Sequence, residues 1–262
     1  LLLFSEQASL LSKAGFPHLI THALLIHNLW PSTNGSINGA LWTMGTVFQF
    51  YLLSVLLYRA MKRKPILTLV ASVAVSVLCK YLIYHMGLAP KGVDSVLYFI
   101  YGRQLVPALD NFMVGMFLSW LLKRRENQQS SASRQWLNFL PFVVGVAALV
   151  LWMMPVSRYG LYGDYPLAYI WHSVLALLLG VTVYFFSRLP LRFGSPLSKG
   201  LLFVSRNQYG IYLWHMPLIK TLLGYSAAVQ GLLNHSFAAA FLLILALTIA
   251  VGTVSTRLID RA

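Results

Sequence analysis

The chain has 262 residues, of which 58% are hydrophobic and only 10% are charged, and its mean hydropathy is +0.69. This composition excludes a water-soluble domain, so we expect an all-α integral membrane protein. A formal net charge of +14 would suggest nucleic acid as the partner of a soluble protein, but here its meaning depends on where the basic residues lie.

Residues 1–39 precede the first stretch able to cross a bilayer, whose core is about 30 Å thick and requires about 20 apolar residues per helix. Within them, "HLITHALLIHNLW" is too short to cross, so we expect an extracytoplasmic segment at the membrane interface. The chain has no initiator Met and no signal-peptide pattern, and its opening "LLLF" fits the tail of an earlier span. We therefore expect this segment to follow a missing N-terminal part.

Residues 40–256 contain long apolar stretches separated by charged residues or by Gly and Pro. None alternates with period two as a membrane barrel strand does, so we predict a bundle of about seven transmembrane helices. The predicted spans are residues 40–58, 66–86, 98–122, 136–156, 166–186, 205–224 and 236–256. Residues 257–262 would then form a short cytoplasmic tail.

The basic residues support this count of spans. If the connections alternate across the membrane, only Lys13, Lys91 and Arg158 fall on one face. The other face collects Arg59, Lys62, Arg63, Lys64, Lys123, Arg124, Arg125, Arg134, Arg188, Arg192, Lys199, Arg206, Arg257 and Arg261. This asymmetry predicts a multi-pass plasma-membrane protein with cytoplasmic basic loops, and it favours membrane lipids over nucleic acid as the partner of these loops.

Polar side chains at membrane depth carry the functional hypothesis, because each costs free energy unless it is paired or hydrated. Counting about 1.5 Å per residue from the outer ends of their spans, we place Gln49, Asp110 and His215 at one depth. Arg103 precedes Asp110 by seven residues, so both would lie on one helix face. We therefore predict a polar layer formed by three helices.

These residues also have purely structural explanations. Gln49 could tie two helices together, and His215 could bond a carbonyl group that is freed by a kink at Pro217. Lys80 and Lys220 lie near span ends, so we expect their ammonium groups to snorkel towards the interface. The Arg103 and Asp110 charges are harder to explain in this way, because charges in a span are usually retained for function.

Motifs for other chemistry are missing from the sequence. The His residues at 18, 22 and 27 have no Cys or carboxylate at ligand spacing, so we predict no metal site. The sequence also contains no Walker loop and no GxSxG elbow.

Four stretches carry a resemblance to a known family. The segment "SRNQYGIYLWHMPLI", residues 205–219, resembles the late "SYGIYLWHxP" signature of the membrane-bound acyltransferase 3 family, with Gln208 in place of Ser. "ALWTMGTVFQFYLL", residues 40–53, resembles the family's "WSLxVExQFYL". "ALDNFMVGMFLSWL" resembles its "FxxGM" helix, and "STRLIDRA" resembles its closing "YxxIExP", with Asp260 in the position of the acid. The matches follow the family's order over nearly the whole chain.

The resemblance implies a bacterial inner-membrane O-acyltransferase. Its donor would be acyl-CoA, used as a co-substrate without any bound cofactor, and its acceptor a sugar hydroxyl of an envelope polysaccharide or glycolipid, with acetyl as the expected group. We expect His215 to act as base or orienting group, Arg103 to hold an anionic part of a substrate, and Asp110 to set the charge state of its neighbours. The expected substrate-binding residues are Trp42, Gln49, Tyr51, Tyr212 and Trp214.

The chain also departs from the family pattern. The family's proposed catalytic His and Arg motifs would precede Leu1, and Val47 stands where the signature has its carboxylate. Arg103 lies further before Phe112 than the family's arginine usually does. Two alternatives therefore stay open: an exporter of a lipid-linked glycan, which would favour internal repeats that the sequence lacks, and a non-catalytic family member, for which Val47 is the main argument.

Overall fold

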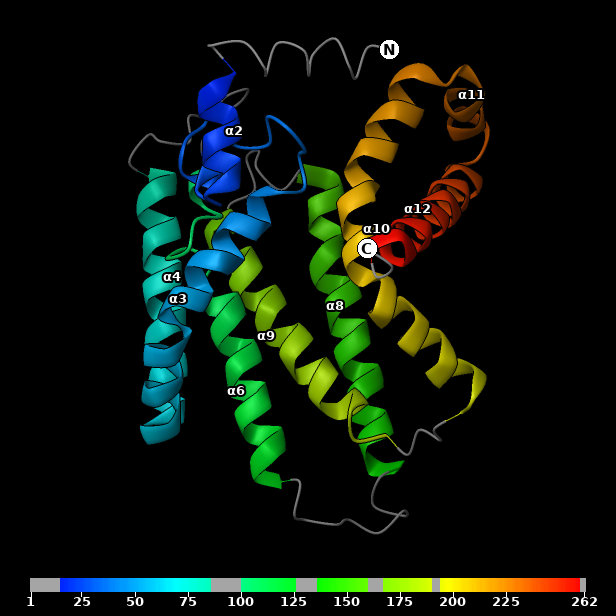
Figure 1. Cartoon of the computed structure of the whole chain (residues 1–262). Helices are drawn as coiled ribbons and strands as arrows, with labels where there is room; N and C mark the ends of the chain where they lie inside the picture. The colour runs from blue at the N-terminus through cyan, green and yellow to red at the C-terminus, as the bar shows by residue number, and fades with distance from the viewer. Residues whose placement is uncertain (1–14, 86–99, 126–135, 160–166, 190–193, 260–262) are drawn as a thin grey trace. The chain divides into compact units, whose positions relative to one another are not determined.

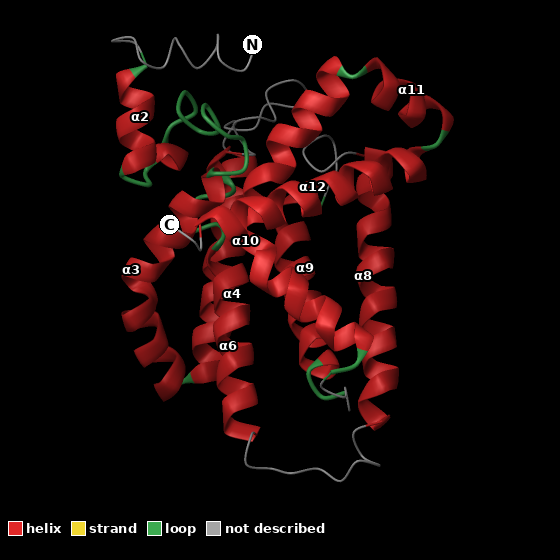
Figure 2. Cartoon of the chain, turned by 45° about the vertical axis from the view of Figure 1, so that its right-hand side comes forward, coloured by secondary structure: helices red, strands yellow, loops and turns green. Residues whose placement is uncertain are grey.

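The computed structural model describes residues 15–85, 100–125, 136–159, 167–189 and 194–259. These ranges consist of helices and loops, without any strand (Figure 2). The first 14 residues of the predicted interfacial segment, and the end of the predicted tail with Asp260, lie outside the described residues. The chain divides into two compact units, each of which is described separately.

The first unit, called the α10 unit, comprises the described parts of residues 1–27, 32–43 and 191–262. The second, called the α4 unit, comprises the described parts of residues 28–31 and 44–190. The boundary between the units falls within α3, which belongs to the α4 unit from Met44 onward. The α10 unit contains α2 (Phe16–Ala23), α10 (Pro196–Tyr225), α11 (Ala227–His235) and α12 (Phe237–Ile259). The α4 unit contains most of α3 (Trp42–Arg63), together with α4 (Pro65–His85), α6 (Leu109–Arg125), α8 (Phe139–Tyr159) and α9 (Ala168–Phe186) (Figure 1). Two short 3-10 helices span His27–Leu29 and Trp136–Asn138.

The helices confirm the predicted all-α membrane fold. Four helices of the described ranges, α3, α4, α9 and α12, are long and apolar enough to cross a membrane, and α8 has a shorter apolar stretch at Phe139–Pro155. The other two predicted spans coincide with α6, which has only 17 residues, and with α10, a helix of 30 residues that includes the polar run "SRNQ" at residues 205–208.

The predicted span at residues 98–122 was placed wrongly at its start. Residues 102–108 form turns, and α6 begins only at Leu109. Pro107 explains the break, because proline has no N–H to donate and disfavours helical geometry at the residue before it. Asp110 therefore lies in the first turn of α6, and the inference that Arg103 shares a helix face with Asp110 is also wrong.

In the α4 unit, α4, α6 and α9 pack against one another, and α8 packs on α9 (Figure 1). The α6–α9 approach depends on Gly180, because a Cβ atom there would lie 2.5 Å from Val114. α3 joins through a cluster of the buried Phe50, Met61 and Met113, and the Phe50 ring stacks on Phe112 with centroids 4.2 Å apart.

In the α10 unit, α10 and α12 cross where two glycines meet. A Cβ atom on Gly252 would lie 2.5 Å from the Ile211 nitrogen, and one on Gly210 would overlap the Gly252 carbonyl. Small residues at such a crossing let two membrane helices bring their backbones together.

We predict that Gly210→Ala and Gly252→Ala each lower the free energy of unfolding by about 1 to 3 kcal/mol, because the added methyl overpacks this crossing. Thermal unfolding in detergent measures the effect. The control is Gly200→Ala, in α10 like Gly210, because a Cβ atom at Gly200 would meet nothing within 4 Å. Equal melting temperatures for Gly252→Ala and Gly200→Ala would contradict the close approach.

Phe16 and Ile20 of α2, with Leu24 directly after the helix, are exposed apolar side chains one turn apart, as expected for a helix that lies at a membrane interface. Behind it, the His22 and His27 rings stack with centroids 3.9 Å apart. His27 is buried, and its Nε2 donates to the Leu41 carbonyl at 2.9 Å. Burial lowers the pKa of both His22 and His27 below the ordinary value.

Because the fold favours neutral His22 and His27 while the unfolded chain protonates near pH 6.5, stability should fall as the pH drops below about 6.5. We predict that the melting temperature falls between pH 7.5 and pH 5.5, and that the fall is smaller in His22→Gln/His27→Gln. His235→Gln, at an exposed position, is the control and should behave like the wild type. An unchanged pH dependence in the double variant would refute the assignment.

Candidate active site

The interior of the α4 unit holds a buried ion pair. The Lys80 ammonium lies 2.7 Å from the Asp110 carboxylate, and the two side chains are 2% and 0% exposed. Lys80 also donates to the Ser173 hydroxyl at 3.0 Å, and that hydroxyl donates to the same Asp110 oxygen. One charged contact thus joins α4, α6 and α9, which we call the ion-pair layer: Lys80, Asp110 and Ser173.

The prediction that Lys80 snorkels is wrong. Lys80 lies five residues before the end of α4 at His85, and its ammonium turns into the bundle instead of towards the interface. The physical reason is Asp110, because a carboxylate buried without a partner costs several kcal/mol more than one held in an ion pair. The other lysine expected to snorkel, Lys220, is exposed.

Ser76 connects the ion-pair layer to the turns before α6. Its hydroxyl donates to the Val106 carbonyl at 3.0 Å and accepts from the Asp110 N–H at 2.9 Å. The second Asp110 oxygen accepts from the Asn111 N–H at 2.8 Å, so both carboxylate oxygens have partners. This arrangement makes Asp110 a fixed charge that anchors the start of α6.

One further ionisable residue lies within electrostatic range of the pair. His172, in α9, interacts electrostatically with Lys80, with Asp110 and with Arg103, which lies in the turns of residues 102–108, called the turn segment. His172 was not predicted from the sequence as a site residue. The signal that could have found it is the polar pair His172–Ser173 within the apolar span predicted at 166–186.

An amide cluster lies on the other side of the turn segment. The Gln49 amide donates to the Asn28 side-chain carbonyl at 3.0 Å, and the Asn28 amide donates to Thr46 at 3.2 Å and to Gln104 at 3.1 Å. Thr46 in turn donates to the Arg103 carbonyl at 3.2 Å. Gln49 therefore ties α3 to residues 28–31 rather than to a second membrane helix.

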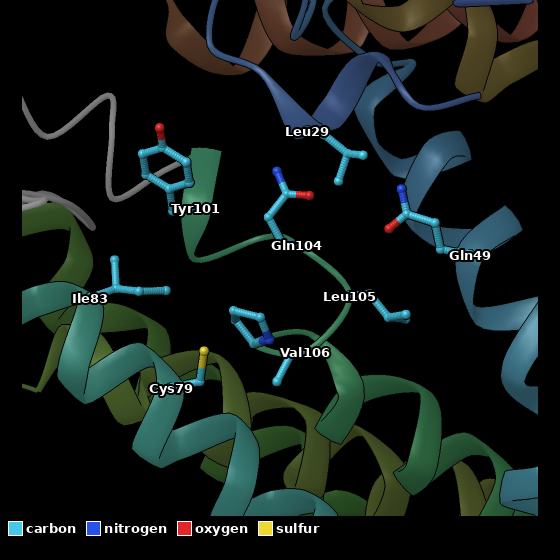
Figure 3. A pocket seen from close by; sticks show the side chains of 9 residues that line it. Leu29, Gln49, Cys79, Ile83, Tyr101, Gln104, Leu105 and Val106 are labelled. Atoms are coloured by element: carbon cyan, nitrogen blue, oxygen red, sulfur yellow. The ribbon is translucent and has the colours of Figure 1, made fainter. Parts of the chain in front are cut away.

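An open pocket of about 380 Å³ lies along the turn segment and borders the amide cluster. Figure 3 shows Gln49 from α3 on one side of the segment, and Cys79 and Ile83 from α4 on the other. The lining is mostly apolar, and the polar groups on it come from Gln49, Gln104 and Tyr101. A pocket of this kind suits an apolar chain that carries one or two hydrogen-bonding groups.

The start of the stretch at residues 40–53 meets the stretch at residues 205–219 in the α10 unit. The Tyr212 hydroxyl bonds the Ala40 carbonyl and the Thr43 hydroxyl, and the Asn38 amide donates to the Leu213 carbonyl at 2.9 Å. His215 donates from Nδ1 to the Tyr212 carbonyl, one turn earlier in the same helix. That bond leaves its Nε2 with the lone pair that a base needs.

The structure brings some predicted site residues together and separates others. Arg103, Asp110 and Gln49 belong to the α4 unit, whereas the site residues Trp42, Tyr212, Trp214 and His215 belong to the α10 unit. Tyr51 is 65% exposed and Trp214 is 37% exposed, whereas Trp42 is half-buried. In the part of the chain that the structure describes, no three His, Cys, Asp or Glu side chains are grouped to hold a metal ion.

Comparison with known families decides the assignment. A family model described as an acyltransferase domain, that of the acyltransferase 3 family, matches residues 4–257. The chain belongs to the acyltransferase 3 family. It is therefore a membrane acyltransferase, and the family predicted from the sequence is confirmed. No curated protein and no solved structure matches the chain.

We predict that Lys80→Met and Asp110→Asn each destabilise the protein by about 3 kcal/mol or more, because each leaves one buried polar partner unsatisfied. The double variant should recover a large part of this loss, since it leaves no lone charge. Unfolding in detergent measures the three values, with Lys220→Met as the exposed control. Additive single and double effects would show that the two residues do not depend on each other.

Proposed function

We propose that this acyltransferase transfers an acyl group, most simply acetyl, from acyl-CoA to a sugar hydroxyl of an envelope polysaccharide or glycolipid. The observation that carries the proposal is the ion-pair layer inside the helices of an acyltransferase, with His172 within electrostatic range of Lys80, Asp110 and Arg103. Charged groups buried in membrane helices are expensive, so their retention favours a role in the reaction.

The reaction needs a base and a group that stabilises an oxyanion. The base takes the proton of the sugar hydroxyl, and the hydroxyl oxygen attacks the thioester carbonyl. The tetrahedral intermediate then collapses with loss of the CoA thiolate, which takes the proton from the base. Arg103 is our candidate to stabilise the developing charge, and Asp110, already fixed by Lys80, sets the local field.

Two histidines are candidates for the base. His215 is favoured by its tautomer, because the bond from its Nδ1 to Tyr212 leaves Nε2 free of a proton. His172 is favoured because it lies within electrostatic range of Arg103 and of the Lys80–Asp110 pair. The substrate-binding roles of Trp42, Gln49, Tyr51, Tyr212 and Trp214 remain part of the proposal, with Gln49 at the pocket of Figure 3.

The basic helix ends suggest where the two substrates arrive. We place acyl-CoA on the cytoplasmic side of the inner membrane, where the positive-inside rule puts the basic loops, and the glycan acceptor on the opposite side. Residues 1–39 would face the acceptor, and residues 40–256 would form the acyltransferase domain.

Membranes that contain the full-length protein should transfer radiolabelled acetyl from acetyl-CoA to an isolated envelope glycan fraction. We predict that replacing the true base with Ala lowers kcat/KM about 10² to 10⁴-fold, so one of His215→Ala and His172→Ala should lose activity to that extent. Arg103→Ala should also lower kcat, because the oxyanion loses a charged donor.

His235→Ala, at an exposed histidine, is the matched control and should retain full activity. Wild-type rates in His215→Ala, His172→Ala and Arg103→Ala alike would refute the proposed site. A wild-type protein that transfers no acetyl would favour the glycan exporter or the non-catalytic alternative that Val47 suggests.

A further inference from the structure

Four aromatic rings gather where α4 ends and α9 begins. Tyr81, Tyr84 and His85 lie in the last five residues of α4, and Tyr169 lies in the first turn of α9. The centre of the Tyr169 ring is 5.4 Å from that of Tyr81, 6.3 Å from that of Tyr84 and 6.3 Å from that of His85. We call these four side chains the aromatic cluster. The distribution of basic residues assigns this end of both helices to the extracytoplasmic side.

The aromatic cluster lies one helical turn outside the ion-pair layer. Tyr84 follows Lys80 by four residues in α4, and Tyr169 precedes Ser173 by four residues in α9. The Lys80 ammonium and the Ser173 hydroxyl are 3.0 Å apart, so these faces of the two helices meet at both levels. Four residues correspond to about 6 Å of rise, a distance that one sugar ring can span. His172, one of the two candidate bases, follows Tyr169 by three residues and lies on the same side of α9.

The rings are supported from the protein interior. Tyr84 packs on the buried pair of Ala168 and Trp171. The Trp171 indole donates to the Trp152 carbonyl at 3.3 Å, and the Trp152 indole donates to the Trp171 carbonyl at 3.1 Å. This support fixes the cluster before a ligand arrives, which lowers the entropic cost of binding.

The rings of the cluster leave one another's faces open. Tyr81 is tilted by 47° to His85, and it meets Tyr169 edge-on at 81°, so neither contact is a face-to-face stack. Tyr81 is 42% exposed, and His85 is exposed as well. A tyrosine combines an apolar ring with a hydroxyl that donates and accepts hydrogen bonds. The cluster therefore offers both ring faces and hydrogen-bonding groups at the outer end of the bundle.

A sugar ring has the matching chemistry. A pyranose has a face of C–H groups, which packs on an aromatic ring, and a rim of hydroxyl groups. The cluster contains no Lys, Arg or carboxylate, and Lys80 beneath it is already paired with Asp110, so the electrostatics favour a neutral sugar over an anionic lipid headgroup. Single tyrosines commonly anchor helices at a membrane interface, but anchoring does not require four rings from two helices to meet above a charged layer.

We propose that the aromatic cluster binds a neutral pyranose unit of the acceptor glycan and holds its reacting hydroxyl beside His172. The inference rests on the proposed function for the class of acceptor. A pyranose packed on Tyr81 and Tyr169 directs hydroxyl groups inward, towards the candidate base one turn deeper in α9. The two tyrosines bind and position the acceptor, so their loss should weaken acceptor binding and leave the donor unaffected.

The test uses the detergent-solubilised full-length protein with an isolated envelope glycan fraction, and it measures acetyl transfer and, by calorimetry, binding. We predict that Tyr81→Leu and Tyr169→Leu, which keep apolar bulk but remove the ring, each raise the KM and the Kd for the glycan about tenfold. Tyr81→Phe and Tyr169→Phe, which keep the ring, should stay within about threefold of the wild type. The KM for acetyl-CoA should not change in any of the four. Tyr225→Leu is the matched control, because Tyr225 is an exposed tyrosine at the end of α10.

Four other results would each overturn a different part of this reasoning. Wild-type KM and Kd values for the glycan in both Leu variants would place the acceptor elsewhere and leave the proposed function intact. If those values are unchanged but stabilisation by short-chain phosphatidylethanolamine is lost, the cluster is an interfacial anchor. Equal rises in the KM for glycan and for acetyl-CoA, with a lower melting temperature, would show that the cluster only holds α4 to α9. A wild type that neither binds the glycan nor transfers acetyl would remove the class of acceptor as well.

One result separates the two proposals in the opposite direction. Glycan binding by the wild type that is lost in the Leu variants, without any acetyl transfer, would support the aromatic cluster as a sugar site and refute the proposed function.

Discussion

A lysine and an aspartate that are 2% and 0% exposed inside a membrane bundle can stay charged only as partners, and this constraint organises the α4 unit. The contact joins three helices, because Lys80 lies in α4, Asp110 in α6 and Ser173 in α9. The pair also fixes the start of α6, because Ser76 holds both the Asp110 N–H and the Val106 carbonyl. The turns before α6, which line the open pocket, therefore depend on the same contact.

The proposed chemistry depends on this arrangement. A membrane acyltransferase must bring a charged donor and a polar acceptor together where water is scarce, so it needs polar groups that are already satisfied before substrate arrives. The ion-pair layer is a set of such groups, and His172 lies within electrostatic range of its two charges.

Much of the fold could be predicted from the sequence, because long apolar runs and the bias of the basic residues are properties of single segments. The family was also predictable, since "YGIYLWH" and "ALWTMGTVFQFYLL" are contiguous. The contacts between helices could not be predicted from the sequence. Lys80 and Asp110 lie 30 residues apart, and nothing in either segment signals that their side chains meet. The break at Pro107 was missed because the flanking residues are apolar enough to suggest one continuous span.

Lys80 is the buried partner of Asp110 and does not snorkel to the membrane interface. An experimental structure of the protein in a lipid nanodisc, at a resolution that defines side chains, tests it most directly. We expect the Lys80 ammonium to lie 2.7 Å from the Asp110 carboxylate, with Ser173 in contact with both. A Lys80 side chain that extends to the headgroup region, with Asp110 bound to another partner, would contradict it.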